Sequence, residues 1–449
     1  MMNQQVYQRA RLSRDRRFDG RFFVAVKTTG IFCRPICPAV APKEENVEYY
    51  PMAELAMQAG YRPCLRCRPD SSPQSWAWKG VETSVERALK LLAQYPELSL
   101  ADIADKLGVT DRYLRKLFQQ RLGIAPKRYQ LFRQLLQAKQ LLHQTNLNVE
   151  QVALACGFQS SRRLQDNFRQ YLQLSPGQIR SNATGQQSMQ IQLNFRPPYN
   201  WPMLRDFLAL RAVPGTEWVT ENSYARLFRL ASCSGYFCAE YQPQQHGFNV
   251  RLDLDDMSQL TTVLGQIRRV LDLDADSQVI SERMLSAGIQ PDHLVEGLRL
   301  PGVWCAFEAG CRAILGQQVS VKAAIGQVTL LVETLGDSTE RGRWFPTPEV
   351  VAEADLSFLR MPASRRDTLQ RFAHYWATIG EPLDADELLH LKGIGPWTVN
   401  YMKLRGYSQP DIWLDTDLVI KKQLLQQAVD DSLVAPWRSY LTFQLWSQA

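Results

Sequence analysis

The stretch LKGIGPWTVNYM, from Leu391 to Met402, decides the fold of the C-terminal part of this 449-residue chain, and IWLDTDLVIKK follows it from Ile412 to Lys422. Gly393 and Gly395 permit a tight turn whose free backbone N–H groups can bind a phosphate oxygen, and Ile394 between them can pack inward. A carboxylate follows about twenty residues later. The stretch therefore predicts a phosphate-binding hairpin between two helices, with an acidic side chain beside it.

The region before the hairpin combines short strands with helices. In FNVRLDL, alternation places Val250 and Leu252 on one face and Arg251 on the other, which predicts a half-buried strand. IQLNF, YARLFRL and GYFCAEY indicate further strands of a small antiparallel sheet, with a helix from Met257 to Leu271 against it. From Val303 onward the pattern is helical.

The whole region from IQLNFRPPYNW to the C-terminus resembles the AlkA branch of the helix-hairpin-helix DNA glycosylases. The resemblance implies an α+β subdomain at residues 190–280, with an antiparallel sheet, and a helix-hairpin-helix domain at residues 281–449. It also implies hydrolysis of the N-glycosidic bond of 3-methyladenine and related alkylated bases in double-stranded DNA, with no cofactor required for that reaction.

Two aspartates, Asp415 and Asp417, compete for the catalytic place. The family's carboxylate precedes an apolar triplet that ends in a basic residue, and Asp417 before LVIK fits that register better. Asp415, followed by Thr416, resembles the sequence motif that more distant members of the superfamily have around their catalytic carboxylate. A carboxylate here would stabilise oxocarbenium character at C1′, or orient the attacking water, as the glycosidic bond breaks.

The residue after Pro396 decides the reaction type. Superfamily members that also cut the strand place a Schiff-base lysine there, whereas this chain has Trp397, so no amine nucleophile is available at that point. No cysteine follows Cys311, so the four-cysteine cluster of some such lyases is absent as well. The resemblance therefore implies a monofunctional glycosylase.

Aromatic side chains are expected to select the base, because a cationic alkylated purine binds electron-rich ring faces. Ordinary core packing is the alternative for each of them. Arg211 also matches a family position, without an assigned role. The candidates for the base pocket are Phe207, Trp397, Tyr401 and Trp446.

The LGQQVS turn departs from the family pattern. A residue of this turn should enter the gap that the flipped base leaves, and relatives can have an apolar residue where this chain has Gln318. A polar side chain can still plug the base stack, and the sequence leaves the efficiency of base flipping with Gln318 open.

Nine cysteines are present, and four of them have the spacing of metal ligands. Cys33 and Cys37 form one close pair, and Cys64 and Cys67 form another after a loop of 26 residues. Two such pairs can supply four thiolates in a tetrahedral array to one zinc ion, while reduced structural thiols are the alternative. An odd total argues against a disulfide scaffold.

From Arg16 through FFVAVKTTGIFCRP, ENVEYY and GYRPCLRCRPD, the chain resembles the N-terminal domain of the Ada family of methyl phosphotriester repair proteins. The resemblance implies a small α/β zinc domain at residues 1–75, in which Cys33 accepts a methyl group from an alkylated DNA phosphate. Zinc would keep the thiolate deprotonated, and Arg34 and Arg66 could hold the phosphate. Because a thioether ligand changes the charge of a four-thiolate zinc site from about −2 to about −1, methylation should strengthen DNA binding.

Residues 81–182 contain an internal repeat, since LADIADKLGVTDRYLRKLF and VEQVALACGFQSSRRLQDNF match at an offset of 49, which becomes 50 by Phe118 and Phe168 because the second segment gains one residue. Each unit has the pattern of an apolar helix, a turn at Gly and a second helix, and PKRYQLFRQLLQAKQLLH is predicted to connect them. The arrangement, including LSPGQIR at 174–180, resembles the AraC-type DNA-binding domain. It implies recognition helices at about 110–119 and 160–170, for whose charges simple solvation is the alternative. Their basic side chains include Arg112, Arg115, Lys116, Arg162 and Arg163.

The formal net charge of +7 is unevenly divided, with +13 in the first 185 residues and −6 in the remainder. The basic N-terminal part indicates a polyanion partner such as nucleic acid, while the acidic C-terminal part must hold DNA by local geometry. No apolar run approaches the ~18 residues that span a bilayer, and we expect a cytoplasmic monomer without a membrane partner. Linkers are predicted at 70–80 and 181–190.

The three resemblances together cover almost the entire chain. They imply a multidomain, mainly α-helical protein with a zinc domain, an all-α double helix-turn-helix domain and an α+β glycosylase module. The leading hypothesis is a fused protein that senses and repairs alkylation, with alkylated and promoter DNA as partners and RNA polymerase as a further candidate. The alternatives are a transcription regulator whose glycosylase module only binds DNA, and a repair enzyme whose AraC-like part is only a DNA anchor.

Overall fold

The computed structural model describes residues 4–15, 18–67, 69, 85, 88–89, 91–92, 99–144, 147–179, 189–230, 233–382, 384–415, 417–425 and 429–448. The predicted linkers lie outside these residues, apart from positions 189 and 190. Internal contacts divide the chain into two units. The first contains residues 1–197, 242–265 and 273–275, and the second contains 198–241, 266–272 and 276–449. The four predicted domain boundaries remain predictions.

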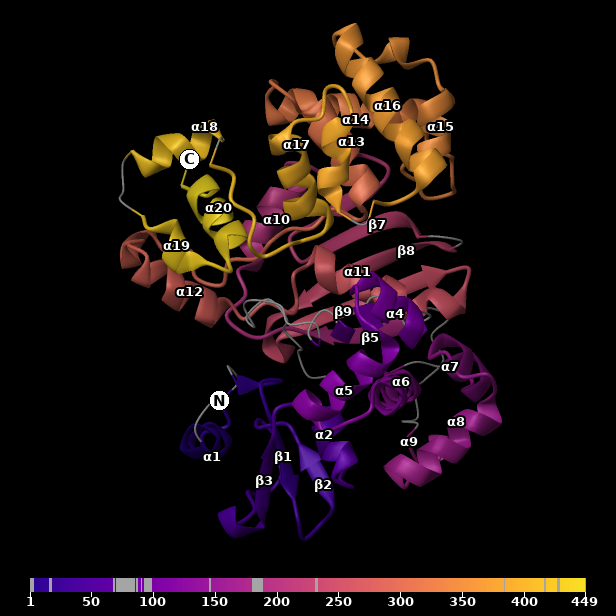
Figure 1. The fold of residues 1–449 in the computed structure, drawn as a ribbon, viewed down its shortest axis with the longest axis vertical. Helices are drawn as coiled ribbons and strands as arrows, with labels where there is room; N and C mark the ends of the chain where they lie inside the picture. The colour runs from indigo at the N-terminus through magenta and orange to yellow at the C-terminus, as the bar shows by residue number, and fades with distance from the viewer. Residues whose placement is uncertain are drawn as a thin grey trace. The chain divides into compact units, whose positions relative to one another are not determined.

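The N-terminal part of the first unit is a four-stranded sheet with the order β3-β1-β2-β4 (Figure 1). Strand β1 (Phe23–Val26) pairs antiparallel with β2 (Ile31–Cys33) and β3 (Val47–Tyr50), and β4 (Arg62–Pro63) runs parallel to β2. Helices α1 (Gln4–Leu12) and α2 (Ala53–Gln58) accompany the sheet. Its small core contains Ala10, Phe22, Val24 and Val47. A core of this size usually needs a metal or disulfides to stay folded.

Residues 99–179 confirm the predicted pair of helix-turn-helix units. Ser99 and Asn148 form capping boxes at the first helix of each unit, and Thr110 and Ser160 cap the second. Gly108 and Gly157 occupy the turns with φ of 65° and 75°, a backbone conformation that favours glycine. The helices are α4 (Leu100–Lys106), α5 (Asp111–Leu122), α6 (Pro126–Gln144), α7 (Val149–Ala155), α8 (Ser161–Asn167) with a π-helical extension (Phe168–Leu172), and α9 (Pro176–Ile179).

Strands β5 (Met189–Asn194) and β9 (Gly247–Leu254) pair antiparallel in the first unit. Val250 and Leu252 are buried and Arg251 is exposed, as the alternation predicts. The predicted helix beyond β9 begins with a short 3-10 turn and continues as α11 (Leu260–Val270). Gln137 of α6 donates from Nε2 to the Thr261 hydroxyl at 2.5 Å, so this segment contacts the connecting helix directly.

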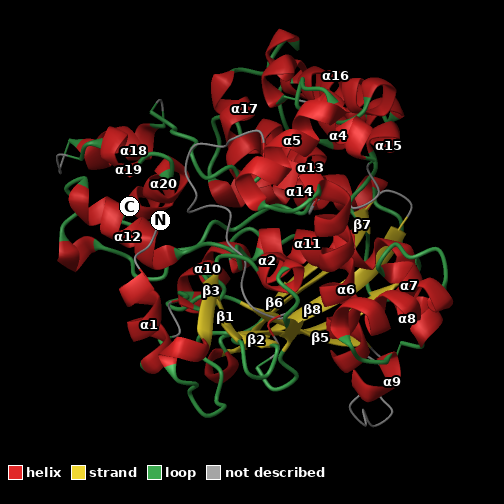
Figure 2. Ribbon diagram, turned by 60° about the horizontal axis from the view of Figure 1, so that its bottom comes forward, coloured by secondary structure: helices red, strands yellow, loops and turns green. Residues whose placement is uncertain are grey.

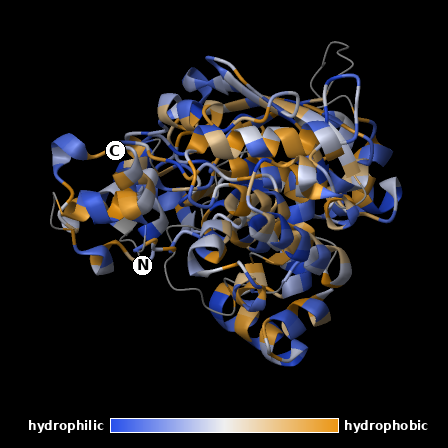
Figure 3. Ribbon diagram, turned by 90° about the horizontal axis from the view of Figure 1, so that it is seen from above, coloured by the Kyte–Doolittle hydropathy of each residue, from blue (hydrophilic) through white to orange (hydrophobic). Residues whose placement is uncertain are grey.

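The second unit combines a small sheet with many helices (Figure 2), and hydrophobic and hydrophilic residues both occur along the helices of the chain (Figure 3). Strands β6 (Glu217–Val219), β7 (Ser223–Leu230) and β8 (Cys233–Gln242) are antiparallel; β6 was not predicted, because three residues carry too little pattern. The rings of Phe307 and Phe372 stack at 5.5 Å in its core. The helices are α10 (Trp201–Ala209), α12 (Ser277–Ser286), α13 (Ala306–Leu315), α14 (Val321–Leu335), α15 (Pro348–Glu353), α16 (Ala363–Ile379), α17 (Pro396–Tyr401), α18 (Leu418–Leu424), α19 (Asp431–Val434) and α20 (Arg438–Trp446).

Candidate functional site

The predicted hairpin lies between a 3-10 helix (Ala385–His390) and α17. Gly393 has a φ of 97°, and a Cβ at this position would lie 2.0 Å from Thr368 Oγ1, so only glycine fits. Gly395 is the N-cap of α17 with an ordinary φ of −111°, and a Cβ there meets no described atom within 4 Å. Ile394 is 5% exposed and packs inward, as expected.

Asp417 is the N-cap of α18. Its Oδ1 accepts the backbone N–H groups of Val419 and Ile420, at 3.0 and 3.3 Å, and the indole N–H of Trp446 at 3.3 Å. Asp415 is exposed two residues earlier. The structure thus brings Asp417 together with one predicted pocket residue, and it holds the carboxylate in place through a helix end.

The four predicted pocket aromatics form two groups joined by aromatic and cation contacts. Trp446 contacts Phe443, whose ring centroid lies 5.2 Å from that of Phe207. Trp397 stacks on Tyr401 with a centroid separation of 5.3 Å. Phe443 was missed by the sequence reasoning, and its only signal is the three-residue spacing from Trp446 on one helix.

Two arginines lie over the ring of Phe207 and connect the groups. The guanidinium carbon of Arg211 is 3.7 Å from the ring centroid, and that of Arg405 is 4.7 Å away. Arg405 also donates to the Tyr401 hydroxyl at 3.3 Å. Burial, reinforced by the neighbouring Arg405 charge, lowers the pKa of Arg211 to about 10, and burial also lowers the pKa of Arg405. The sequence reasoning missed Arg405, which lies one helical turn after Tyr401.

The turn that contains Gln318 is tied to the hairpin. Gln317 donates from Nε2 to the Gly393 carbonyl at 3.2 Å and to the Thr398 hydroxyl at 3.1 Å. Gln318 itself is exposed and has a φ of 55°, which is uncommon for a residue with a side chain. Gln318 therefore lies at an exposed turn. The preceding residue, Gln317, ties this turn to Thr398, which follows Trp397.

The four predicted metal ligands come together in the first unit. Cys33 ends β2, and the backbone N–H of Cys64 donates to the Phe32 carbonyl at 2.9 Å, so the pairing of the strands brings the two cysteine pairs together. The four sulfur atoms lie within 4.8 Å of one another. Zinc–sulfur bonds of about 2.3 Å in a tetrahedron require sulfur separations of about 3.8 Å, so the cluster fits one zinc ion. The members are Cys33, Cys37, Cys64 and Cys67.

Arg34 occupies a different place from the one predicted. Its side chain is buried, forms an ion pair with Asp19 and donates to the Cys67 carbonyl at 3.3 Å, while its backbone N–H donates to the Cys67 sulfur at 3.3 Å. A buried guanidinium needs a carboxylate partner, and Asp19 supplies it. Arg34 therefore supports the ligand shell, whereas Arg66 is exposed and available to a phosphate.

The predicted DNA-contacting side chains of the helix-turn-helix units are exposed on α5 and α8. Leu114 and Leu164 of the same helices are buried, so each helix directs its basic side away from the core. Arg115 pairs with Asp111 one turn earlier at 2.7 Å. The exposed set is Arg112, Arg115, Lys116, Arg162 and Arg163.

Within the part of the chain that the structure describes, no helix has both the length and the apolar character to cross a membrane.

Three family models match successive parts of the chain. The metal binding domain of Ada matches residues 6–70, a helix-turn-helix domain matches residues 103–182, and the AlkA N-terminal domain matches residues 190–305. The class of protein is therefore a fusion of an Ada-type metal-binding domain, a helix-turn-helix domain and an AlkA-type module.

The relatives narrow the class to one family. A probable bifunctional transcriptional activator/DNA repair enzyme AlkA of Mycobacterium tuberculosis is 34% identical over 98% of this chain and 95% of its own length. The DNA-3-methyladenine glycosylase 2 of Escherichia coli is 32% identical over 57% of this chain and 95% of its own length. The bifunctional transcriptional activator/DNA repair enzyme Ada of Escherichia coli is 40% identical over 26% of this chain and 33% of its own length. The chain belongs to the family of AlkA-type bifunctional transcriptional activator/DNA repair enzymes.

Proposed function

We propose that this protein repairs alkylated DNA and regulates transcription, and that its second unit hydrolyses the N-glycosidic bond of 3-methyladenine and related bases. The observation that carries the proposal is the position of Asp417, whose carboxylate is hydrogen-bonded to Trp446 at one end of a series of aromatic side chains. The similarity to the Escherichia coli 3-methyladenine glycosylase supports this choice of substrate. Double-stranded DNA is the partner that all the domains share.

The proposed reaction follows from the charges at the site. As the bond between C1′ and the base nitrogen breaks, its electrons leave with the cationic base, which departs neutral. The Asp417 carboxylate stabilises the oxocarbenium character that remains on the sugar. A water oxygen then bonds to C1′ and releases a proton. Because Trp397 stands where a lyase has lysine, no Schiff base forms and the strand is not cut.

Cys33 is the proposed acceptor in a second, self-inactivating reaction. A zinc ion bound by the four cysteines would hold the Cys33 sulfur as a thiolate. The sulfur forms a bond to the methyl carbon as the bond from that carbon to the phosphotriester oxygen breaks, and a phosphodiester anion leaves. Cys33 is half-buried at the end of β2. Exposed Arg66 is the candidate that contacts the phosphate.

Methylation would turn damage into a signal, because the metal site loses one negative charge and repels DNA phosphates less. The exposed arginines of α5 and α8 would then read promoter DNA. A methylated and an unmethylated sample should differ in affinity for the same promoter and in salt dependence. Equal values for both samples would contradict this part of the proposal.

A regulator whose glycosylase module only binds DNA is the second candidate, favoured by the polar Gln318 at the exposed turn. Release of 3-methyladenine from alkylated double-stranded DNA separates the two. Wild type and Asp415→Asn should release the base, and Asp417→Asn should be slower by about 100-fold or more. A wild type without activity on this substrate supports the second candidate.

A further inference from the structure

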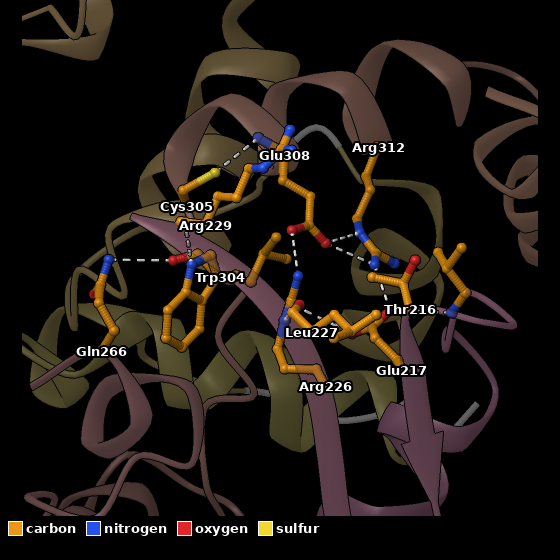
Figure 4. Close-up of polar contacts among 12 residues, drawn as sticks. Thr216, Glu217, Arg226, Leu227, Arg229, Gln266, Trp304, Cys305, Glu308 and Arg312 are labelled. Carbon is orange, nitrogen blue, oxygen red and sulfur yellow. Dashed lines mark hydrogen bonds and ion pairs between the residues drawn. The ribbon is translucent and has the colours of Figure 1, made fainter. Parts of the chain in front are cut away.

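Four charged side chains are buried together in the second unit (Figure 4). Glu217 begins β6, Arg226 lies in β7, and Glu308 and Arg312 lie one turn apart in α13. Their exposed fractions are 9%, 1%, 1% and 9%, respectively. We refer to these four residues as the charge cluster.

The charges of the cluster alternate around a closed ring. Arg226 contacts Glu308 at 2.8 Å and Glu217 at 3.5 Å. Arg312 contacts Glu217 at 2.5 Å and Glu308 at 2.7 Å, and its Nε donates to Glu308 at 2.9 Å. The Tyr224 hydroxyl donates to Glu217 at 2.8 Å. Two cations and two anions thus neutralise one another within hydrogen-bonding distance.

Stability alone does not account for such a cluster. Removing four charges from water carries a large desolvation penalty, and apolar side chains of similar volume often stabilise a core equally well or better. What an arginine fork adds is geometry, because its planar donors fix the direction of several acceptors at once. The question is therefore which other groups the cluster orients.

The cluster holds the backbone that leads out of the pocket helix α10. Arg312 donates from Nη1 to the Arg211 carbonyl at 2.8 Å, and Glu217 accepts the Val213 N–H at 3.0 Å. Both bonds act on the segment directly after α10, which carries Phe207. The guanidinium of Arg211 lies over the Phe207 ring. The charge cluster thus fixes the backbone on which Arg211 reaches the pocket.

Helix α13, which carries Glu308 and Arg312, leads from the charge cluster to the hairpin. Five residues after Arg312, Gln317 donates to the Gly393 carbonyl and the Thr398 hydroxyl, and Thr398 follows Trp397. Helix α13 therefore contacts the Arg211 side of the predicted pocket through Arg312, and the turn that directly follows α13 contacts the Trp397 side through Gln317. A shift of α13 would move one side relative to the other.

We propose that Arg312 is a positioning residue for base excision: through the charge cluster it places Arg211 on Phe207 and keeps the two sides of the base pocket in register. The inference rests on the proposed glycosylase function. In Arg312→Lys the positive charge stays, but a single ammonium group cannot reach two carboxylates and the Arg211 carbonyl in the same fixed directions. The pocket should then be misaligned while the unit remains folded.

The experiment compares Arg312→Lys with Arg229→Lys in the full-length protein. Arg229 serves as the control because it lies on β7, the strand that carries Arg226 of the charge cluster, but pairs with the exposed Asp337 outside the cluster. Single-turnover release of 3-methyladenine separates the fraction of active enzyme, given by the amplitude, from the rate constant. Arg312→Lys should keep its amplitude and lose about 10- to 100-fold in rate constant, and the control should match wild type. A smaller amplitude with an unchanged rate constant would assign the cluster a purely structural role.

A second measurement does not depend on activity. The side-chain N–H signal of Arg211, assigned by its loss in Arg211→Lys, should carry a ring-current shift from Phe207, because the guanidinium lies over that ring. This shift should disappear in Arg312→Lys and persist in Arg229→Lys. An unchanged Arg211 signal in Arg312→Lys overturns the positioning role, whether or not wild type releases the base. A wild type that shows the shift but releases no base contradicts only the proposed function.

Discussion

Substitution by alanine should destabilise the protein at Gly393 of the hairpin and have little effect at Gly395. Gly393 has a φ of 97°, which alanine adopts only with strain, and the new Cβ would lie 2.0 Å from Thr368 Oγ1 and 2.8 Å from its Cγ2. Thr368 is 4% exposed and its hydroxyl donates to the Ser364 carbonyl, so it has little freedom to move. Gly395 has an ordinary φ and open space around its Cα hydrogens.

Left-handed backbone costs about 1–2 kcal/mol for alanine, and overpacking adds about 1–3 kcal/mol. Gly393→Ala should therefore destabilise the second unit by about 3 kcal/mol. Gly395→Ala causes neither backbone strain nor overpacking and should change the free energy of unfolding by less than about 0.5 kcal/mol. Adding Thr368→Ala to Gly393→Ala removes the two shortest contacts and should restore part of the loss, while the backbone strain stays.

Urea unfolding followed by tryptophan fluorescence measures this, because nine of the eleven tryptophans lie in the second unit. The three variants should rank in stability as Gly395→Ala above the double variant, and the double variant above Gly393→Ala. Equal midpoints for Gly393→Ala and Gly395→Ala would refute the steric reasoning. A double variant no more stable than Gly393→Ala would show that the backbone, rather than Thr368, sets the requirement for glycine.

Three further predictions concern the site. Asp417→Ala removes a helix cap and should cost about 1 kcal/mol in urea unfolding, whereas Asp417→Asn keeps a capping oxygen and should not; equal stabilities would contradict the capping role. Burial alone would raise the pKa of Glu217, but the charges of Arg312 and Arg226 outweigh it and lower the pKa to about 2, below its ordinary 4.5. The ionised Glu217 should therefore stabilise the second unit fully above pH 4.5, and the free energy of unfolding should fall by on the order of 3 kcal/mol as the pH falls toward 2. Urea unfolding midpoints should show this loss in wild type and not in Glu217→Gln. Gln318→Leu should raise the single-turnover rate of base release, with an unchanged rate counting against Gln318 as the wedge.

Local motifs could be predicted because their evidence lies close together in the sequence. The pattern within each repeated unit, the spacing within each cysteine pair and the alternation in FNVRLDL are all local, and the structure has the expected helices, cysteine cluster and strand. Strand β6 was not predicted, because three residues are too few to show an alternating pattern. The inward packing of Ile394 followed from its place between two glycines.

Side-chain partners between distant segments could not be predicted, since sequence spacing says nothing about which charges meet in the folded core. Arg34 and Arg66 each lie next to a cysteine of the predicted metal site, yet Arg34 pairs with Asp19 and is buried against Cys67. The only feature of the sequence that pointed to Arg405 is its spacing of four residues from Tyr401, although its guanidinium lies over the Phe207 ring in the structure.

The amino-acid sequence by itself determined the order of the modules, the metal ligands, the hairpin and the choice of tryptophan over lysine, because each is a matter of residue identity at a fixed local spacing. The tertiary structure decided how the predicted pocket residues come together. It brings Asp417 to Trp446, places two arginines on one phenylalanine ring and closes a ring of four buried charges behind them. These arrangements arise because buried charges must find partners wherever the folded chain provides them, including Glu308, which is 82 residues from Arg226.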